Sequence, residues 1–322
     1  MDRTMKSMLY DRYGSPDVVR VGEVPIPEPV GSQVLVKVSA TSINLTDWEG
    51  LTGSPAYARI GGIRRPAKKT LGSDISGVVE AVGPDVQEFT VGDAVYGDNL
   101  AGMGGFAEYA VASERVLAPK PPELTHVEAS TIPQAGAIAL QGMVRAADGK
   151  RVLINGAGGG SGAFAIQLAK RAGAYVTAVD NGGKLDFMNS LGADEVVDYT
   201  KNDFVTSTEP HDLILDLVAT RSPLACKRAL APGGVYRCVG GPARVLLGMA
   251  IGGLILGRLS DRSIGVLGVK MGPTHFAGMA ELCSGKEIAI HVDRVFDLAD
   301  VAEALAYVGA GKARGKVVVT SG

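Results

Sequence analysis

Residues 149–170 of this chain, GKRVLINGAGGGSGAFAIQLAK, decide the fold of the segment around them. Residues 152–155 form a short apolar run with β-branched members, as in a buried parallel strand, and seven residues follow of which only Ala157 and Ser161 are not glycine. Helix formers resume over residues 163–171 and are apolar on nearly every side, as expected of a helix packed onto a sheet. The stretch therefore predicts a strand, a glycine turn and a helix, which together make half of a βαβ unit.

The glycines of this turn predict a phosphate site. Gly156, Gly159 and Gly162 recur at every third position, which allows a tight turn, a close approach of the backbone to a pyrophosphate, and close packing of the helix on its strand. The free N–H groups and the dipole of the helix start favour a negative charge there. A second apolar run, residues 175–179, ends in Asp180, eighteen residues after Gly162 (180 − 162), near the distance at which an acidic residue meets the adenine ribose.

Further motifs occur along nearly the whole chain. They are Tyr13-Gly14-Ser15-Pro16, Asn44 with Asp47, Leu71-Gly72-Ser73-Asp74 with Gly77, Gly105-Phe106-Ala107-Glu108-Tyr109, Leu191-Gly192-Ala193-Asp194 with Tyr199, and residues 311–319. With the glycine turn, and in this order, they resemble the zinc-independent medium-chain dehydrogenases/reductases of the quinone oxidoreductase (zeta-crystallin-like) family. The resemblance implies an α/β protein in which a Rossmann nucleotide-binding domain is inserted in a GroES-like, partly open β-barrel catalytic domain, with the active site in the cleft between the two.

The texture of the chain predicts where these domains begin and end. Residues 1–122 carry short apolar runs separated by Gly, Pro and Asp, which indicates a partly open barrel. Residues 123–270 alternate strand and helix patterns, as in a Rossmann domain. We expect its six strands in runs that begin near Val152, Tyr175 and Val196 and in residues 213–218, 235–239 and 264–269. Residues 271–322 have the pattern of a helix followed by a strand. The resemblance implies that they belong to the first domain.

Composition limits the classes of protein to which this chain can belong. At 322 residues, with 46% hydrophobic residues and 44 glycines, the sequence suits a two-domain α/β enzyme with well-formed cores. Its net charge of −2 offers no basic surface for nucleic acid. The start, MDRTMKSMLY, lacks the apolar run of a secretory signal, and three widely spaced cysteines suit a reducing compartment. We expect a cytoplasmic protein.

One apolar run invites a membrane interpretation. Residues 245–257 are thirteen residues with four glycines, fewer than the roughly 20 that a spanning helix needs. We expect a buried or subunit-facing helix, with peripheral membrane contact as the alternative. A homodimer formed through residues 264–269 would cover an otherwise open edge of the nucleotide-binding sheet.

The sequence argues against a catalytic zinc ion. Zinc-dependent relatives of the resembled family carry a catalytic cysteine, a Gly-His-Glu and a lobe of closely spaced cysteines. This chain reads Gly72-Ser73-Asp74, has no cysteine before Cys226, and spreads its four histidines without ligand spacing. Without a Lewis acid to polarise a simple ketone, the favoured substrates are those that accept hydride readily, namely quinones and α,β-unsaturated carbonyls.

Three residues of the first domain are candidates for the reaction itself. The resemblance implies that Asn44 and Asp47 line the nicotinamide and substrate side of the cleft, where Asn44 would hold the nicotinamide or a substrate oxygen. Both are also good helix caps, which is the structural alternative. Tyr57 is a candidate proton donor. The structural alternative is an exposed loop tyrosine, in which case the proton comes from solvent. The expected reaction is hydride transfer from nicotinamide C4, in which the protein positions the reactants and excludes water.

Cofactor contacts are expected from the glycine turn and from the loops that follow neighbouring strands. The candidates are Gly156, Gly158, Gly159, Gly160, Ser161, Gly162, Asp180, Asn181, Lys184, Tyr199, Leu217, Val218, Val239 and Gly240. Asp180 argues for NADH, because a carboxylate binds the ribose diol and repels a 2′-phosphate. Lys184 and Tyr199 match positions that bind the 2′-phosphate in NADPH-dependent relatives of the resembled family. We therefore expect NADPH, with NADH as the alternative; the structural alternatives are a solvated Lys184, a packed Tyr199 ring and a helix-capping Asp180.

The sequence leaves two other functions open. Ser161 resembles the nucleophile of an α/β-hydrolase, since Asp216 and His291 follow it in the expected chain order, but Ala163 replaces the last glycine of G-x-S-x-G and Ser161 lies six positions after Asn155 (161 − 155). The second alternative is an NADPH-binding structural or regulatory protein with little turnover, as found among some relatives of the resembled family.

Overall fold

The computed structural model of the protein describes residues 3–60 and 62–321, which form two compact units. One unit is Met1–Ala137 with Met271–Gly322, and the other is Ile138–Lys270. The sequence places the boundaries at residues 122 and 270, whereas the structure places the first boundary at residue 137, inside helix α3 (Pro133–Gly142). The additional residues belong with the barrel because they bond to its strands: His126 Nδ1 lies 2.8 Å from Ser76 Oγ.

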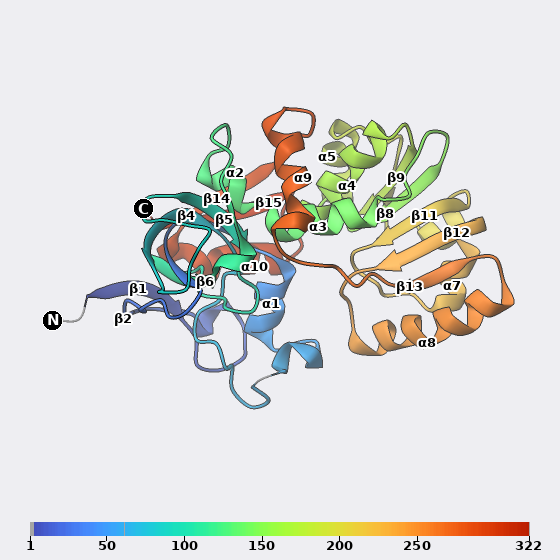
Figure 1. Ribbon diagram of the computed structural model, residues 1–322. Coiled ribbons are helices and arrows are strands. Elements are labelled where there is room, and N and C mark those ends of the chain that lie inside the picture. The colour runs from blue at the N-terminus through green and yellow to red at the C-terminus, as the bar shows by residue number, and fades with distance from the viewer. Residues whose placement is uncertain (1–2, 61, 322) are drawn as a thin grey trace. The chain divides into compact units, whose positions relative to one another are not determined.

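The unit Ile138–Lys270 is a doubly wound Rossmann domain, as predicted (Figure 1). Its strands are all parallel and lie in the order β10-β9-β8-β11-β12-β13, which is 3-2-1-4-5-6 by sequence. All six predicted runs form strands: β8 (Arg151–Asn155), β9 (Tyr175–Asp180), β10 (Glu195–Asp198), β11 (His211–Asp216), β12 (Leu230–Cys238) and β13 (Ser263–Val266).

Helices cover both faces of this sheet (Figure 1). They are α4 (Gly160–Arg171) and α5 (Leu185–Ser190) on one face and α7 (Pro223–Arg228) and α8 (Ala243–Leu259) on the other, with α6 (Phe204–Ser207) and the short helix η4 (Gly182–Lys184) between strands. The core under α7 and α8 joins Cys226 and Met249 to Leu153, Ile214 and Ile264 of the strands. The predicted apolar helix is therefore α8, which packs against β13. In the described ranges no helix is both long and apolar enough to cross a membrane.

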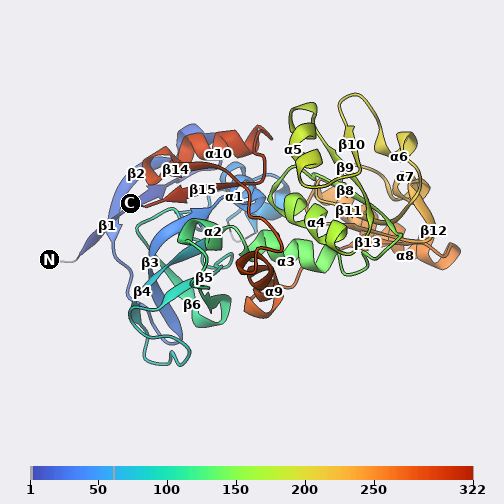
Figure 2. The same ribbon diagram turned by 90° about the horizontal axis from the view of Figure 1, so that it is seen from above.

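The second unit contains a sheet that curves around β3 (Gln33–Ser42) without closing (Figure 2). β6 and β15 pair with different parts of one side of β3, and β4 runs along its other side. The order is β14-β15-β3-β4-β5-β7, with β6 on β3, and a separate hairpin pairs β1 (Thr4–Leu9) with β2 (Arg20–Pro25). The remaining strands are β4 (Asp74–Val82), β5 (Ala94–Asp98), β6 (Tyr109–Ser113), β7 (Leu117–Pro119), β14 (Val292–Asp297) and β15 (Lys316–Thr320). The predicted partly open barrel is confirmed.

Helices of this unit pack against the barrel sheet and against one another. Helix α1 (Leu45–Thr52) packs against α10 (Val301–Gly309), and the core there includes Leu51, Leu305 and Val317. The other helices are α2 (His126–Ser130), α3, α9 (Pro273–Ser284), and the short helices η1 (Pro16–Val18), η2 (Ala56–Arg59), η3 (Glu114–Val116) and η5 (Leu298–Asp300). Residues 271–322 thus rejoin the barrel unit, as the resemblance implies.

Candidate functional site

The glycine loop joins the end of β8 to the start of α4. The N–H groups of Gly156 and Ala157 donate to Val179 O at 2.9 and 3.1 Å, which ties the loop to the neighbouring strand β9. Gly156 has φ of +82°, a left-handed conformation that favours glycine. Helix α4 has no side-chain cap at Gly159, so the first N–H groups of the helix are not satisfied by capping. A pyrophosphate is the kind of anion that such a helix start accepts.

Gly162 and Gly159 have opposite surroundings. A Cβ on Gly162 would lie 2.5 Å from Ala157 Cα and 2.5 Å from the carbonyl oxygens of Ala157 and Gly156, so only glycine fits there without moving the backbone. A Cβ on Gly159 would find its nearest neighbour, Gly156 O, at 3.6 Å. The loop is therefore closed on the side of Gly162 and has room beside Gly159.

Four of the predicted cofactor residues lie at the same edge of the sheet as this loop. Leu217 and Val218 follow β11, and Val239 and Gly240 follow β12, and both strands are parallel to β8. A Cβ on Gly156 would lie 3.2 Å from Leu217 Cβ and 3.2 Å from Val218 Cγ2. Leu217 and Val218 are therefore immediate neighbours of the glycine loop.

The residues predicted to select the cofactor form one bonded group. Asp180 Oδ2 accepts from the N–H of Gly158 at 3.0 Å, and its Oδ1 lies 3.3 Å from Lys184 Nζ. The Asp180 and Lys184 side chains are only 10% and 8% exposed, so a solvated Lys184 is wrong. The lysine stem also lies against the loop, since a Cβ on Gly158 would meet Lys184 Cδ at 2.5 Å.

Asn181 and Tyr199 complete this group. Asn181 caps the short helix η4, where its side chain accepts from the N–H of Gly183 at 3.1 Å. The cap is therefore Asn181, and a helix-capping Asp180 is wrong. The backbone N–H of Tyr199 donates to Asp180 O at 3.1 Å, while the Tyr199 residue is 53% exposed. A packed Tyr199 ring is thus also wrong, and the ring is available to a ligand.

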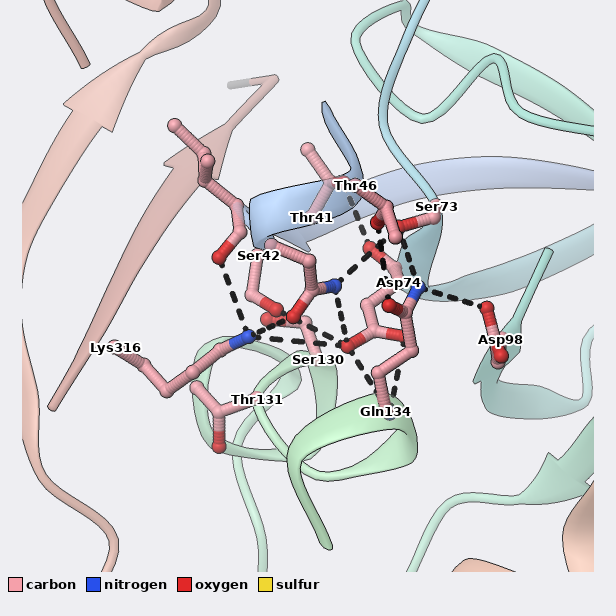
Figure 3. A network of polar contacts seen from close by, with 12 residues as sticks. Thr41, Ser42, Thr46, Ser73, Asp74, Asp98, Ser130, Thr131, Gln134 and Lys316 are labelled. Carbon is pink, nitrogen blue, oxygen red and sulfur yellow. Dashed lines mark hydrogen bonds and ion pairs between the residues drawn. The ribbon is translucent and has the colours of Figure 1, made fainter. Parts of the chain in front are cut away.

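The barrel unit contains a buried polar network that includes Ser73, Asp74 and Lys316 (Figure 3). Asn44, which precedes α1, also belongs to it. Asn44 Nδ2 donates to Asp74 Oδ2 at 2.9 Å and to Ser73 Oγ at 3.3 Å. Asn44 Oδ1 accepts from Lys316 Nζ at 2.7 Å. Lys316 also donates to Ile43 O at 3.3 Å and lies 3.9 Å from Asp74 Oδ2. The Asn44 side chain therefore bridges a buried cation and a buried anion.

Gln134 of α3 extends the same network (Figure 3). Its Nε2 donates to Ser73 Oγ at 2.7 Å and to Asp98 Oδ1 at 3.0 Å, and its backbone N–H reaches Asp74 Oδ2 at 3.3 Å. Thr46 Oγ1 donates to Gln134 Oε1 at 3.3 Å. The second oxygen of Asp98 is buried and has no hydrogen-bond donor among the described residues.

The Asp47 carboxylate accepts hydrogen bonds from two backbone N–H groups. Its Oδ2 accepts from the N–H of Asn44 at 2.8 Å, and its Oδ1 accepts from the N–H of Gly72 at 2.9 Å. The carboxyl group is fully buried, and both of its oxygens already have donors. The helix-capping alternative therefore describes Asp47. The Asn44 side chain faces Asp74 and Lys316, and Asn44 is also the N-cap of α1 and forms a capping box with Asp47.

The electrostatics of the network follow from burial. Burial raises the pKa of Asp47 and of Asp98 to about 6 each, and hydrogen bonds to these carboxyl groups oppose the rise. Burial also raises the pKa of Asp74 and lowers the pKa of Lys316, while the opposite charge of each partner counters the other's shift. Lys316 therefore offsets the cost of burying the surrounding acidic groups.

Tyr57 lies in η2 and is half-buried, so an exposed loop tyrosine is wrong. Its hydroxyl donates to Glu49 Oε1 at 2.8 Å. Burial raises the pKa of Tyr57, and the hydrogen bond to Glu49 raises it further. Burial likewise raises the pKa of Glu49, which the hydrogen bond from Tyr57 opposes.

Sequence reasoning missed several members of these groups: Glu49, Asp98, Gln134 and Lys316. One signal was available for Lys316, because a lysine that opens the apolar run 316–320 is out of place in a buried strand unless it has a partner. Nothing local points to Gln134 or Asp98, whose partners come from other parts of the chain.

The hydrolase alternative finds no support in the Rossmann unit. Ser161 lies in the first turn of α4 rather than on a sharp turn at the end of β8. Asp216 accepts from Asn155 Nδ2 at 2.8 Å and from Tyr236 Oη at 2.6 Å, so both of its oxygens are engaged. As to metals, the described residues contain no group of three or more His, Cys, Asp or Glu side chains that could hold an ion.

Comparison with known proteins places the chain in a family. Residues 31–122 match the model of the alcohol dehydrogenase GroES-like domain, and residues 191–319 match a model described as zinc-binding dehydrogenase. The chloroplastic quinone-oxidoreductase QR1 of Triphysaria versicolor is 33% identical over 98% of this chain and 98% of its own length. The chloroplastic NADPH-dependent alkenal/one oxidoreductase of Arabidopsis thaliana is 33% identical over 67% of this chain and 58% of its own length.

A solved structure agrees with these relatives over the whole length. The quinone oxidoreductase from Coxiella burnetii superposes with a TM-score of 0.88 at 28% identity, covering 99% of this chain and 100% of that one. Two domain models in the expected order, a full-length relative and a full-length structural match all agree with the motifs and the strand order. The chain belongs to the zinc-independent quinone oxidoreductase family of medium-chain dehydrogenases/reductases.

Proposed function

We propose that this protein is an enzyme that uses NADPH to reduce quinones or α,β-unsaturated carbonyls. The observation that carries the proposal is the glycine loop, whose Gly162 leaves no space for a Cβ and whose Gly159 begins a helix without a side-chain cap. The names of the plant relatives add the substrate class, since one is a quinone oxidoreductase and another an NADPH-dependent alkenal/one oxidoreductase.

The residues of the chain would bind and orient the reactants. A bound nicotinamide cofactor supplies the hydride. The α4 start and the N–H groups beside Gly159 would hold its pyrophosphate. Leu217 and Val218 would pack along the cofactor and exclude water on that side, since they adjoin Gly156. Asn44 would contact a reactant through its amide, while the proton comes from solvent or from Tyr57 Oη, whose hydrogen now points to Glu49.

The preference for NADPH rests on the Asp180–Lys184 pair. An unpaired carboxylate at the end of β9 would repel a 2′-phosphate, but here Lys184 Nζ lies 3.3 Å from Asp180 Oδ1 and offsets its charge. Asp180 also holds the N–H of Gly158, which gives it a role in the loop independent of any ribose. The exposed Tyr199 ring and the Lys184 ammonium can then bind the 2′-phosphate. NADH is the alternative cofactor.

We also propose a homodimer formed through β13. This strand lies at the edge of the Rossmann sheet, and within residues 3–60 and 62–321 no further strand pairs with its outer side. The adjacent helix α8 carries exposed apolar side chains, among them Leu247, Leu254 and Leu259, which a partner subunit would cover. Peripheral membrane contact through residues 245–257 is the alternative. The cytoplasm remains the proposed compartment, since the three cysteines are free and buried.

Cofactor oxidation tests the proposal directly. NADPH and NADH are titrated separately into the purified protein by fluorescence, and oxidation of the tighter one is followed with a simple quinone and a simple enone. Tight NADPH binding and turnover with either substrate support the proposal. Binding without turnover on both substrates would indicate the structural or regulatory alternative, and failure to bind either cofactor would contradict the assignment of the glycine loop.

A further inference from the structure

Two isoleucines of the barrel unit stand out because their side chains are almost fully exposed. Ile60 is 85% exposed and Ile63 is 80% exposed, in the segment that follows η2. Isoleucine is among the residues most often buried, and an exposed isoleucine keeps a large apolar surface in water. A single exposed apolar residue is normal on a protein surface, whereas neighbouring ones mark a surface that an apolar partner can cover.

The same segment is strongly basic. Residues 59–69 contain no acidic residue and five cationic ones, all of them exposed: Arg59, Arg64, Arg65, Lys68 and Lys69. The Lys69 ammonium lies 3.2 Å from Asp11 Oδ1. Within residues 3–60 and 62–321, Arg64, Arg65 and Lys68 have no acidic side chain at ion-pair distance. The net charge of the whole chain is −2, so the positive charge of this segment is a local feature.

The backbone of the segment is anchored to the rest of the barrel unit. Tyr13 Oη donates to Gly62 O at 2.6 Å, and the Arg59 guanidinium lies over the Tyr13 ring, 4.8 Å from its centroid. The N–H of Tyr10 donates to Lys69 O at 3.0 Å. These contacts hold the chain before, between and after the two isoleucines. A partner that covers the isoleucines therefore does not have to order the backbone first, which removes an entropic cost of binding.

We propose that residues 59–60 and 62–69, which form a basic apolar segment, dock the protein on an anionic lipid bilayer. Charge complementarity decides the partner, because three cations without acidic partners are attracted by the negative potential of anionic headgroups. The isoleucines distinguish a bilayer from a soluble anion or a nucleic acid, since their side chains can enter the boundary between headgroups and acyl chains. The segment belongs to the barrel unit and is distinct from residues 245–257 of the Rossmann unit.

Docking has a consequence for the choice of substrate, which rests on the proposed function. Tyr57, the candidate proton donor, lies in η2 immediately before the basic apolar segment. Quinones with long apolar tails dissolve in a bilayer rather than in water. A protein held at the bilayer surface therefore meets such quinones at a raised effective concentration. The substrate class that docking favours is the bilayer-dissolved quinone.

Sedimentation with vesicles tests the docking without cofactor or substrate. The full-length protein is mixed with vesicles of phosphatidylcholine alone or with about one third phosphatidylglycerol. We expect binding to the mixed vesicles, release at high salt, and little binding to phosphatidylcholine alone. The variants Ile60→Ser/Ile63→Ser and Arg64→Gln/Arg65→Gln/Lys68→Gln should each lower the vesicle partition coefficient about tenfold or more. All five side chains are exposed, so both variants should fold as the wild type does.

Val144 provides the matched control. Its side chain is also 80% exposed and Arg145 follows it, but it belongs to the Rossmann unit. Val144→Ser should keep wild-type binding. Inserted tryptophans locate the contact: on mixed vesicles the emission of Ile63→Trp should shift to shorter wavelength, and that of Val144→Trp should not. A wild type that stays unbound would overturn the inference, as would Ile60→Ser/Ile63→Ser binding as the wild type does or a shift at Val144→Trp alone.

Turnover separates this inference from the proposed function. We expect Ile60→Ser/Ile63→Ser to reduce a water-soluble quinone at the wild-type rate, and a long-chain quinone held in mixed vesicles about fivefold more slowly or worse. Wild-type rates on the vesicle quinone would contradict the favoured substrate class. A wild type that binds mixed vesicles but reduces neither quinone would contradict the proposed function and still support the docking.

Discussion

The pair Gly162→Ala and Gly159→Ala separates the two tasks of the glycine loop. A methyl group on Gly162 would lie 2.5 Å from three backbone atoms, so the loop must move by about 1 Å to reach ordinary contact. Such overpacking costs about 3 kcal/mol, and alanine regains about 1 kcal/mol of helix propensity in α4. The net loss of about 2 kcal/mol should lower the Tm by about 6 °C.

Gly159→Ala should behave in the opposite way. The nearest atom to its methyl group would be Gly156 O at 3.6 Å, and φ at Gly159 is −90°, which alanine adopts freely. Stability of the free protein should therefore change by no more than about 0.5 kcal/mol. The methyl group would, however, occupy the room beside the loop that a pyrophosphate needs, and NADPH affinity should fall about tenfold or more.

Two measurements decide the matter: thermal unfolding of the free proteins and fluorescence titration with NADPH. We expect Gly162→Ala to unfold at a lower temperature than wild type, and Gly159→Ala to keep its Tm and lose its affinity. If Gly159→Ala binds NADPH as wild type does, the phosphate does not approach the loop at Gly159. If Gly162→Ala unfolds at the wild-type temperature, the close packing at Gly162 does not constrain the sequence.

Three further predictions concern other parts of the chain. Lys184→Ala should collapse affinity for NADPH and leave affinity for NADH within about twofold, as measured by titration; equal losses for both would contradict a 2′-phosphate role. Burial lowers the pKa of His211 from 6.5 to about 4, so the unfolded chain takes up the proton first, and wild type should lose about 3 kcal/mol of stability between pH 6.5 and pH 4 that His211→Gln does not lose in urea unfolding. Leu254→Asp, at a side chain 70% exposed on α8, should convert dimers to folded monomers by light scattering, and an unchanged mass would place the interface elsewhere.

The Rossmann unit could be predicted almost completely because its signals are local. Each strand is a short apolar run, and the glycine turn marks the end of the first strand. These local patterns therefore predict the order of the elements. The first domain boundary was harder to predict. The segment before α3 has a helical pattern, but its membership depends on bonds such as His126 with Ser76, fifty residues apart, which no pattern reveals.

At the candidate site, the sequence identified side chains but could not predict which of them pair. Asp180 and Lys184 are four positions apart and both were identified, yet they were weighed as opposing signals, whereas in the structure they are partners. Asn44 was identified from a motif, but the bond that orients it comes from Lys316, 272 positions later. Periodicity and spacing describe neighbours along the chain, and a contact of this range is decided only when the barrel sheet forms.

The place of β15 in the barrel sheet has a consequence for synthesis of the chain. β15 lies between β14 and β3 in the sheet. During synthesis, residues 40–42 of β3 therefore have no pairing partner on that side until residues 316–320 have been made. The Rossmann unit, by contrast, is continuous from Ile138 to Lys270 and has all of its strands earlier. A ribosome delivering this chain therefore releases a complete nucleotide-binding unit first. The barrel unit, with Asn44 still lacking its lysine, matures only afterwards.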